Sequence, residues 1–218
     1  MKEKLEDMYE RMFSFFGPQN WWPADTALEV MIGAILAQNT NWKNVEKAIS
    51  NLKEKELLDV LKLYEIPEQE LSLLIRPAGY FKVKAKRIKN LISHIVKNYN
   101  SELSNFFSLD TSSLRQELLS IKGIGPETAD SIILYAAKKP IFVVDAYTYR
   151  IMKRHQMIWD DITYDELQQL FMENLPSDES LFNEFHALIV ETGKHFCKKK
   201  PLCNYVLFMV GLKNNLYL

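Results

Sequence analysis

Apolar residues recur along most of this chain at the spacing of successive helical turns. The pairs Ala27-Leu28, Met31-Ile32 and Ile35-Leu36, for example, follow one another at one-turn intervals. Alternation of β-branched and polar residues, which would indicate strands, is scarce. The pattern therefore predicts an essentially all-α protein, with helices over residues 3–14, 26–36, 42–53, 54–64, 67–75, 83–99, 113–121, 126–137, 146–155, 164–174 and 180–195.

The segment from Ser113 to Arg150 carries the most specific local pattern. Ser113, with Gln116 three residues later, predicts a capping box at the start of a helix. Gly123-Ile124-Gly125 then interrupts the helix, and Pro126 suits the first turn of the next one. Such a turn points backbone amides outward at a helix N-terminus, where they can bind a phosphate. A Gly-X-Gly turn alone could equally serve any helical hairpin.

Composition narrows the class of protein. The chain has 218 residues, of which 47% are hydrophobic and 12% aromatic, so it can bury a substantial core and is not disordered. No apolar run approaches membrane-spanning length and no signal-peptide pattern begins the chain, so we expect a cytoplasmic, nucleoid-associated protein with no membrane partner. The net charge of −1 does not itself predict nucleic-acid binding, although the lysines and arginines are clustered. One cluster comprises Lys82, Lys84, Lys86, Arg87 and Lys89, and the other Lys194, Lys198, Lys199 and Lys200.

The whole string around the turn resembles a known signature. Leu118-x-x-Ile121-x-Gly123-Ile124-Gly125-x-x-Thr128-Ala129-x-x-Ile132, followed by Val143-Val144-Asp145, resembles the helix-hairpin-helix and Gly/Pro-Asp signature of the endonuclease III superfamily of DNA glycosylases. The resemblance implies two helical domains with a cleft between them. Residues 19–129 would form a six-helix domain carrying the hairpin, and residues 1–18 with 130–218 the second domain. The implied partner is double-stranded DNA with damaged bases, bound by a monomer.

Asp145 matches the catalytic aspartate of the superfamily. A carboxylate beside the sugar stabilises the positive charge that develops when the base leaves, and it helps to position water. The alternative interpretation is an N-cap for the helix that starts at Ala146, and the two roles are compatible.

The resemblance also implies a set of DNA contacts. Gln38 would fill the gap left by an everted base, and the hairpin would bind a phosphate. The segment 79–86 looks like the loop and helix of the superfamily that run along DNA, although a solvated helix face remains the alternative for a basic cluster. The expected DNA-binding residues are Gln38, Lys84, Lys86, Lys122, Gly123, Ile124 and Gly125.

Glu127 departs from the pattern of strand-nicking relatives. Those relatives carry at this position a lysine that forms a Schiff base with the sugar, which a carboxylate cannot do. Glu127 would otherwise be a favourable acid in the first turn of a helix. We therefore expect a monofunctional glycosylase without lyase activity.

The cysteines depart from the pattern as well. Cys197 and Cys203 look like the first half of a [4Fe–4S] loop, but Val206 and Leu212 stand near the positions of the third and fourth ligands. Two cysteines cannot supply four thiolates within one chain, so we expect no cluster. The four histidines, His94, His155, His186 and His195, show no metal-binding spacing and are interpreted as structural or surface residues. A monovalent cation at the hairpin carbonyls, as in relatives, is compatible with the sequence, but no residue requires it.

Three tryptophans suggest which base is bound. Trp21-Trp22-Pro23 and Trp42 resemble the aromatic slot of the 3-methyladenine glycosylase branch that lacks the iron–sulfur cluster, although Trp42 is bulkier than the phenylalanine expected there. Alkylated purines are cationic, and aromatic faces attract them by stacking and cation–π contact. Packing in a core is the alternative role for each tryptophan. The alternative functions are a glycosylase for an oxidised pyrimidine or a mismatch, and a non-catalytic helix-hairpin-helix DNA-binding protein.

Overall fold

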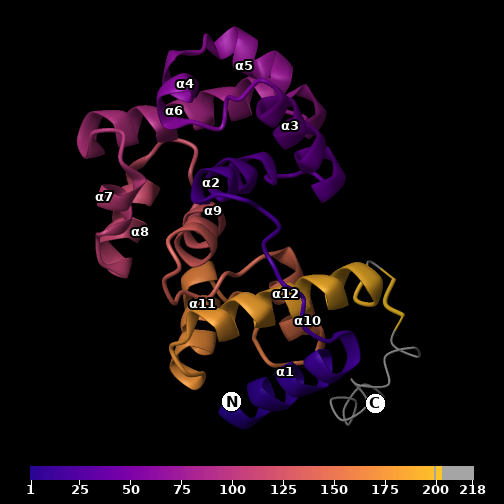
Figure 1. Cartoon of the computed structure of the whole chain (residues 1–218). Coiled ribbons are helices and arrows are strands. Elements are labelled where there is room, and N and C mark those ends of the chain that lie inside the picture. Colours follow the sequence, from indigo (N-terminus) through magenta and orange to yellow (C-terminus); the bar gives the residue numbers. More distant parts are fainter. Residues whose placement is uncertain (199, 203–218) are drawn as a thin grey trace. The chain divides into compact units, whose positions relative to one another are not determined.

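The computed structural model describes residues 1–198 and 200–202, and within them every regular element is a helix (Figure 1). The predicted all-α class is confirmed. The chain divides into two compact units: Ala24–Lys139, and Met1–Pro23 together with the chain from Pro140 onward. The domain expected over residues 19–129 therefore begins and ends earlier in the sequence than this unit. Residues 132–136 remain with the hairpin because they pack on the central helix of that unit.

The unit Ala24–Lys139 is built around α2 (Ala27–Leu36). Nearly every residue of α2 is buried, because α3, α6, α9 and η2 all contact it. Thr26 caps α2 by accepting a hydrogen bond from the Glu29 amide. The other elements are α3 (Trp42–Glu54), α4 (Val60–Glu65), α5 (Glu68–Leu74), the 3-10 turn η1 (Arg76–Ala78), α6 (Phe81–Tyr99), α7 (Leu103–Phe107), α8 (Thr111–Ser120), α9 (Pro126–Ser131) and the π-helical turn η2 (Ile132–Ala136).

The second unit contains α1 (Lys2–Phe16), α10 (Ala146–Arg154), α11 (Tyr164–Asn174) and α12 (Glu179–His195). Helix α12 contacts both α1 and α10. An aromatic cluster fills the core: Phe142 stacks on Phe171 with ring centroids 3.9 Å apart, and Phe182 and Phe185 meet Phe142 edge-on. This cluster anchors the segment that leads to Asp145.

Two details of the hairpin helices differ from the sequence-based prediction. Helix α8 starts two residues earlier than expected, because Asp110 Oδ1 accepts the amides of Ser112 and Ser113 at 3.0 Å each. The capping box predicted at Ser113 is therefore wrong. The second hairpin helix is also not one regular helix, because α9 passes into the π-helical turn η2 at Ile132.

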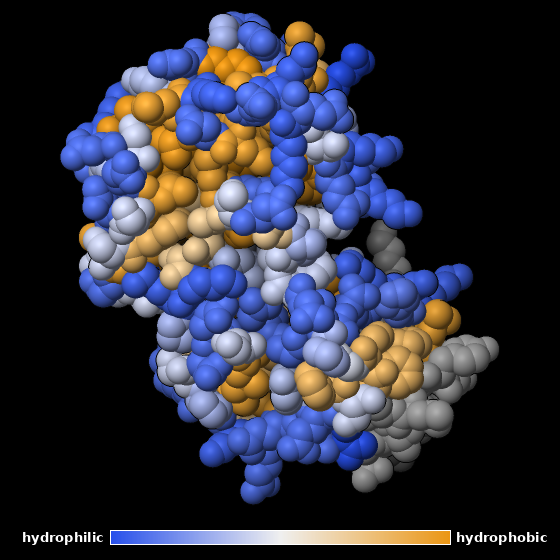
Figure 2. Space-filling model, viewed as in Figure 1, coloured by the Kyte–Doolittle hydropathy of each residue, from blue (hydrophilic) through white to orange (hydrophobic). Residues whose placement is uncertain are grey.

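The surface of the Ala24–Lys139 unit mixes apolar and polar areas. Figure 2 shows hydrophobic areas on its viewed face, interrupted by hydrophilic side chains. Large apolar side chains such as Leu61, Leu73 and Val83 are at least half exposed on this unit. Among the described residues, no helix is long and apolar enough to cross a lipid bilayer.

Candidate active site and nucleic-acid interface

Asp145 lies at the end of an extended segment that α11 holds in place. Ile141, Phe142, Val143 and Val144 are buried, and Gln168 Nε2 donates to the Phe142 carbonyl oxygen at 2.6 Å. The Val144 amide donates to Tyr164 Oη at 3.4 Å. With both its backbone and its side chains fixed, the segment delivers Asp145 to a defined position at the start of α10.

Asp145 is the N-cap of α10, as the alternative interpretation predicted. Its Oδ1 accepts the Thr148 amide at 2.7 Å and the Thr148 hydroxyl at 2.9 Å. The Asp145 amide in turn lies 3.4 Å from Thr148 Oγ1, which completes a capping box. A carboxylate here also interacts favourably with the positive end of the helix dipole.

A histidine faces the other oxygen of this carboxylate. His186 Nε2, on α12, lies 3.8 Å from Asp145 Oδ2, and the two side chains are only 7% and 12% exposed. Burial by itself raises the pKa of Asp145, but the interactions with His186 and Thr148 outweigh burial, so the pKa lies below the ordinary carboxyl value. Asp145 is therefore ionised at neutral pH.

Helix α10 also packs closely against α12 at Gly193. A Cβ atom on Gly193 would lie 2.1 Å from a ring carbon of Tyr147, so only glycine allows this close approach. The Arg150 guanidinium lies over the Tyr147 ring, 4.8 Å from its centroid, and Arg150 Nε donates to the Cys197 carbonyl oxygen at 2.6 Å.

The start of the cysteine loop is held by arginines of α10. Arg154 Nη1 lies 3.1 Å from Cys197 Sγ and 2.6 Å from the Lys198 carbonyl oxygen. Cys203, Val206 and Leu212 lie outside the described residues. Within those that are described, no group of three or more histidine, cysteine or acidic side chains is arranged to hold a metal ion.

In the hairpin, the two glycines have different roles. Gly123 has φ +103°, which L side chains rarely adopt, and a Cβ atom there would lie 2.4 Å from Arg87 Cγ. Gly125 has φ −100°, and its Cβ position is open. The left-handed geometry expected of the turn therefore belongs to Gly123. At Gly125 the absence of a side chain keeps the N-terminus of α9 open.

A buried ion pair fixes the two hairpin helices to each other. Arg115 Nε on α8 donates to Asp130 Oδ1 on α9 at 2.8 Å, and Arg115 Nη2 donates to Asp130 Oδ2 at 3.3 Å. The Asp130 side chain is fully buried, so this two-point contact determines how α8 and α9 meet at the turn.

Gln38 braces the hairpin. Its Nε2 donates to Thr128 Oγ1 at 2.9 Å and to the Gly123 carbonyl oxygen at 3.3 Å, and its Oε1 accepts from Arg87 Nη1. Arg87, which the sequence placed only in a basic cluster, thus packs on Gly123 and bonds to Gln38. The Nε2 end of Gln38 thus bonds to the hairpin, and its Oε1 end bonds to Arg87 of α6.

Several backbone groups of the turn already have protein partners. The Ile124 amide donates to the Ile121 carbonyl oxygen at 3.0 Å, so this expected phosphate donor instead closes the turn. The carbonyl oxygens of Lys122 and Gly123 accept from Asn90 and Gln38. The carbonyl oxygens of Ile121, Lys122 and Gly123 thus each accept one hydrogen bond from the protein.

Lys84 does not lie at the surface, which corrects the expectation that it contacts DNA. It is 1% exposed, and its Nζ donates to the carbonyl oxygens of Leu36 at 2.9 Å and Ala78 at 2.8 Å. Burial, followed by the charge of Arg87, lowers its pKa to about 8. Lys84 therefore joins the end of α2 to the turn η1. Lys86 and Lys122 are exposed, and Glu127 is exposed in the first turn of α9.

The tryptophans predicted to line a pocket fall in both units. Trp21 and Trp22 are half-buried and meet edge-to-face with centroids 5.9 Å apart, and Pro23 after them is exposed. Lys194 Nζ lies 5.1 Å from the Trp21 ring centroid, in a cation–π contact. Trp42, at the first position of α3, is half-buried in the Ala24–Lys139 unit.

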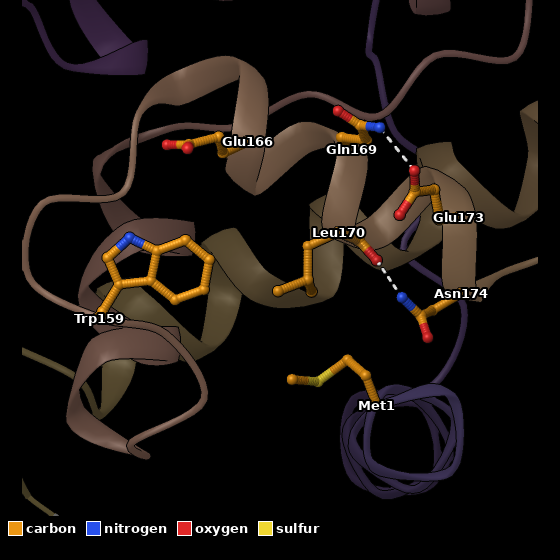
Figure 3. A pocket seen from close by; sticks show the side chains of 7 residues that line it. All are labelled: Met1, Trp159, Glu166, Gln169, Leu170, Glu173 and Asn174. Atoms are coloured by element: carbon orange, nitrogen blue, oxygen red, sulfur yellow. Dashed lines mark hydrogen bonds between the residues drawn. The ribbon is translucent and has the colours of Figure 1, made fainter.

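A separate surface hollow lies beside α11 (Figure 3). Trp159, Leu170 and Met1 supply its apolar lining, together with polar side chains of α11. Its carboxylates are engaged: Glu166 accepts from Thr163, and Glu173 accepts from Gln169 at 2.5 Å. None of the expected site residues lines this hollow, so we do not assign base excision to it.

His186, Arg87 and Arg154 were not recognised from the sequence as parts of these sites. His186 stands alone in an apolar run, and no local pattern indicates that it faces Asp145. Arg87 lies three residues after Lys84 in the same basic cluster. The cluster alone does not show that the Lys84 side chain is buried while Arg87 reaches Gly123 and Gln38. Arg150 and Arg154 lie one helical turn apart, and this spacing could have indicated that both arginines contact the same segment.

This combination of an all-α chain, a Gly-Ile-Gly hairpin and an ionised aspartate after a buried extended segment defines a helix-hairpin-helix repair protein. The profile of the HhH-GPD superfamily of base excision DNA repair proteins matches residues 32–177, and the chain belongs to that family. It is therefore a DNA glycosylase of base excision repair.

Individual relatives cover nearly the whole chain. A provisionally assigned DNA repair glycosylase of Methanocaldococcus jannaschii is 51% identical over 203 residues, which are 93% of this chain and 92% of that protein. Endonuclease III of Thermotoga maritima is 29% identical over 91% of this chain and 87% of its own length. The solved structure of the 3-methyladenine DNA glycosylase of H. pylori, bound to 1,N6-ethenoadenine, has a TM-score of 0.76 and 31% identity, covering 88% of this chain and 96% of that one.

Proposed function

We propose that this protein is a monofunctional DNA glycosylase that excises alkylated purines such as 3-methyladenine. The observation that carries the proposal is the ionised Asp145 carboxylate, fixed at the N-terminus of α10 at the position of the catalytic aspartate in the family signature. The 31% identity to a 3-methyladenine glycosylase over 88% of the chain supports the choice of base.

Release of an alkylated purine needs a carboxylate near the sugar but little acid catalysis at the base. An N3-alkylated purine is cationic, so when the bond from C1′ to the base breaks, its electron pair neutralises the leaving base. The positive charge moves to the sugar, where Asp145 stabilises it electrostatically. Water then adds to C1′, and its proton passes to the carboxylate or to solvent. An everted base is required for access, and Gln38 is the proposed residue that fills its place.

Glu127 supports the absence of lyase activity. The position where strand-nicking relatives carry a lysine holds an exposed carboxylate here. A carboxylate cannot form the Schiff base that precedes strand cleavage. The proposed products are therefore a free base and an intact abasic strand.

The tryptophans are proposed to bind the base. Trp21, Trp22, Pro23 and Trp42 would supply apolar faces for a cationic purine, each contact contributing about 0.5–2 kcal/mol. Lys194 already lies over Trp21, where its ammonium disfavours a second cation on the same ring face. Trp22 and Trp42 are therefore the preferred stacking partners within this proposal.

We also propose that the protein works without an iron–sulfur cluster. The chain contains two cysteines, whereas a cluster needs four thiolate ligands. The residues do not fit the cofactor in a second respect, since the Arg154 guanidinium lies against the Cys197 thiol. A monovalent cation at the hairpin remains compatible with this proposal, because a carbonyl oxygen that accepts one hydrogen bond keeps a second lone pair.

A panel of duplex oligonucleotides tests the proposal. The duplexes carry an alkylated purine, an oxidised pyrimidine or a mismatch, and each is analysed with and without alkali. The expected result is strand breakage only after alkali and only for the alkylated purine, with Asp145→Asn inactive but able to bind. Breakage without alkali would overturn the monofunctional assignment. Activity only on the oxidised pyrimidine or the mismatch would favour a glycosylase for that lesion. Absence of activity on every lesion would favour a non-catalytic DNA-binding protein.

A further inference from the structure

We infer that His186 is a positioning residue for Asp145: its ring holds the Oδ2 side of the carboxylate while Thr148 holds Oδ1. This inference rests on the proposed catalytic role of Asp145. It assigns a function to a buried histidine that the family signature does not contain.

The two oxygens of Asp145 are held from different helices. Both hydrogen bonds from Thr148, at 2.7 and 2.9 Å, end on Oδ1 and come from the first turn of α10. His186 Nε2 approaches Oδ2 from α12 at 3.8 Å, which is longer than a direct hydrogen bond, so an N–H group at Nε2 acts on the carboxylate through its dipole. Contacts on both oxygens fix the plane of the carboxyl group, which Thr148 alone would leave free to turn.

His186 is a polar side chain among buried apolar residues. Its neighbours on α12, Phe185, Ala187, Leu188 and Ile189, are fully buried apolar residues. An imidazole in such a stretch costs desolvation free energy that a leucine would not, unless a polar group faces it. The Asp145 carboxylate is the charged group that faces Nε2.

Positioning of this kind matters for base release. A carboxylate stabilises the developing sugar cation most when it is already oriented, since nothing then reorganises during the reaction. A displacement of about 1 Å can cost about 100-fold in rate. We expect that loss of the Nε2 contact slows base release by about 10- to 100-fold, while DNA binding is retained.

Substitutions at His186 separate positioning from packing. The amide nitrogen of glutamine can occupy the place of Nε2, whereas asparagine is too short and leucine carries no donor. His186→Gln should therefore retain most of the rate, and His186→Asn and His186→Leu should lose it. His195→Leu is the matched control, because His195 lies on the same helix but its side chain is 60% exposed and faces Glu191.

The experiment measures single-turnover base release from methylated duplex DNA, affinity for a duplex with a non-cleavable abasic analogue, and the melting temperature of each variant. The inference is supported if the rate falls in the order wild type, Gln, then Asn, with equal affinities. It is overturned if Asn and Gln variants release the base equally fast, a comparison that stands even where the leucine variant fails to fold. Activity in Asp145→Asn would instead overturn the proposed function.

Discussion

Arg154 Nη1 lies 3.1 Å from Cys197 Sγ, in a hydrogen bond from a guanidinium to the thiol that begins the cysteine loop. The same nitrogen donates to the Lys198 carbonyl oxygen at 2.6 Å, and the Leu202 amide closes the loop by donating to the Phe196 carbonyl oxygen at 3.0 Å. Protein hydrogen bonds thus hold the start of the loop that follows Cys197. They also attach it to α10, the helix that Asp145 caps.

We predict that Arg154→Met lowers the free energy of unfolding by about 1 kcal/mol. The substitution removes the charged, half-exposed donor of the hydrogen bonds to Cys197 Sγ and the Lys198 carbonyl oxygen. It should also speed tryptic cleavage after Lys198. Denaturant titration and limited proteolysis measure both effects. Lys153→Met is the control, since Lys153 lies next to it on α10 but pairs with exposed Asp160. Equal effects of the two substitutions would show that the Arg154 contacts do not hold the loop.

Lys84 makes a prediction about pH. Its pKa is lowered to about 8, so above that pH the unfolded chain binds more protons than the folded one. The contribution of Lys84 to stability therefore rises from about pH 8 towards the unfolded pKa of about 10.4. Lys84→Met leaves the carbonyl oxygens of Leu36 and Ala78 without this donor, which costs about 1–3 kcal/mol.

The destabilisation by Lys84→Met should consequently be larger at pH 9.5 than at pH 7. Urea titrations of both proteins at the two pH values measure the difference. Lys86→Met, on the exposed side of the same helix, should show no such change. If Lys84→Met lowered the free energy of unfolding equally at both pH values, folding would not lower the pKa of Lys84.

The sequence could predict the hairpin because its geometry is local. Gly123 permits the positive φ angle that the turn needs, and Pro126 fixes φ at a value suited to the first turn of a helix. Both effects depend on the residue itself and not on tertiary contacts. Lys84 was assigned wrongly because a run of lysines shows which charges are adjacent, not which one turns inward. Helical spacing did hold that information, since Lys84 stands one turn before buried Ile88 and two before buried Leu91.

The contact between His186 and Asp145 could not be predicted in this way. It joins two elements far apart in the sequence, and an isolated histidine in an apolar helix has no partner that spacing can indicate. The position of Asp145 itself was predictable, because an aspartate followed by a helical pattern is a helix start. Its partner depends on how α10 and α12 pack.

The two glycines of the turn should respond differently to alanine. Gly123→Ala places a Cβ against Arg87 in a backbone conformation that disfavours side chains, so we expect a loss of about 1–3 kcal/mol. Gly125→Ala meets open space with φ −100° and should be nearly neutral in stability. If the Gly125 amide binds a phosphate, the added methyl group should still weaken DNA binding. Thermal unfolding and titration with duplex DNA distinguish the two effects; equal losses of stability would contradict the assigned geometry.

Gln38 combines a structural role with a proposed DNA contact, and two substitutions separate them. Gln38→Ala and Arg87→Met each remove their mutual hydrogen bond, so Arg87→Met should destabilise the protein by about 1 kcal/mol. Gln38→Ala also removes the bonds to Thr128 and Gly123 and should destabilise it somewhat more. Only Gln38→Ala removes the side chain proposed to replace the everted base. Its rate of base release should therefore fall well below that of Arg87→Met, because the everted state loses its support. Single-turnover kinetics with alkylated duplex DNA measure this. Equal rates in the two variants would show that Gln38 acts only as a brace for the hairpin.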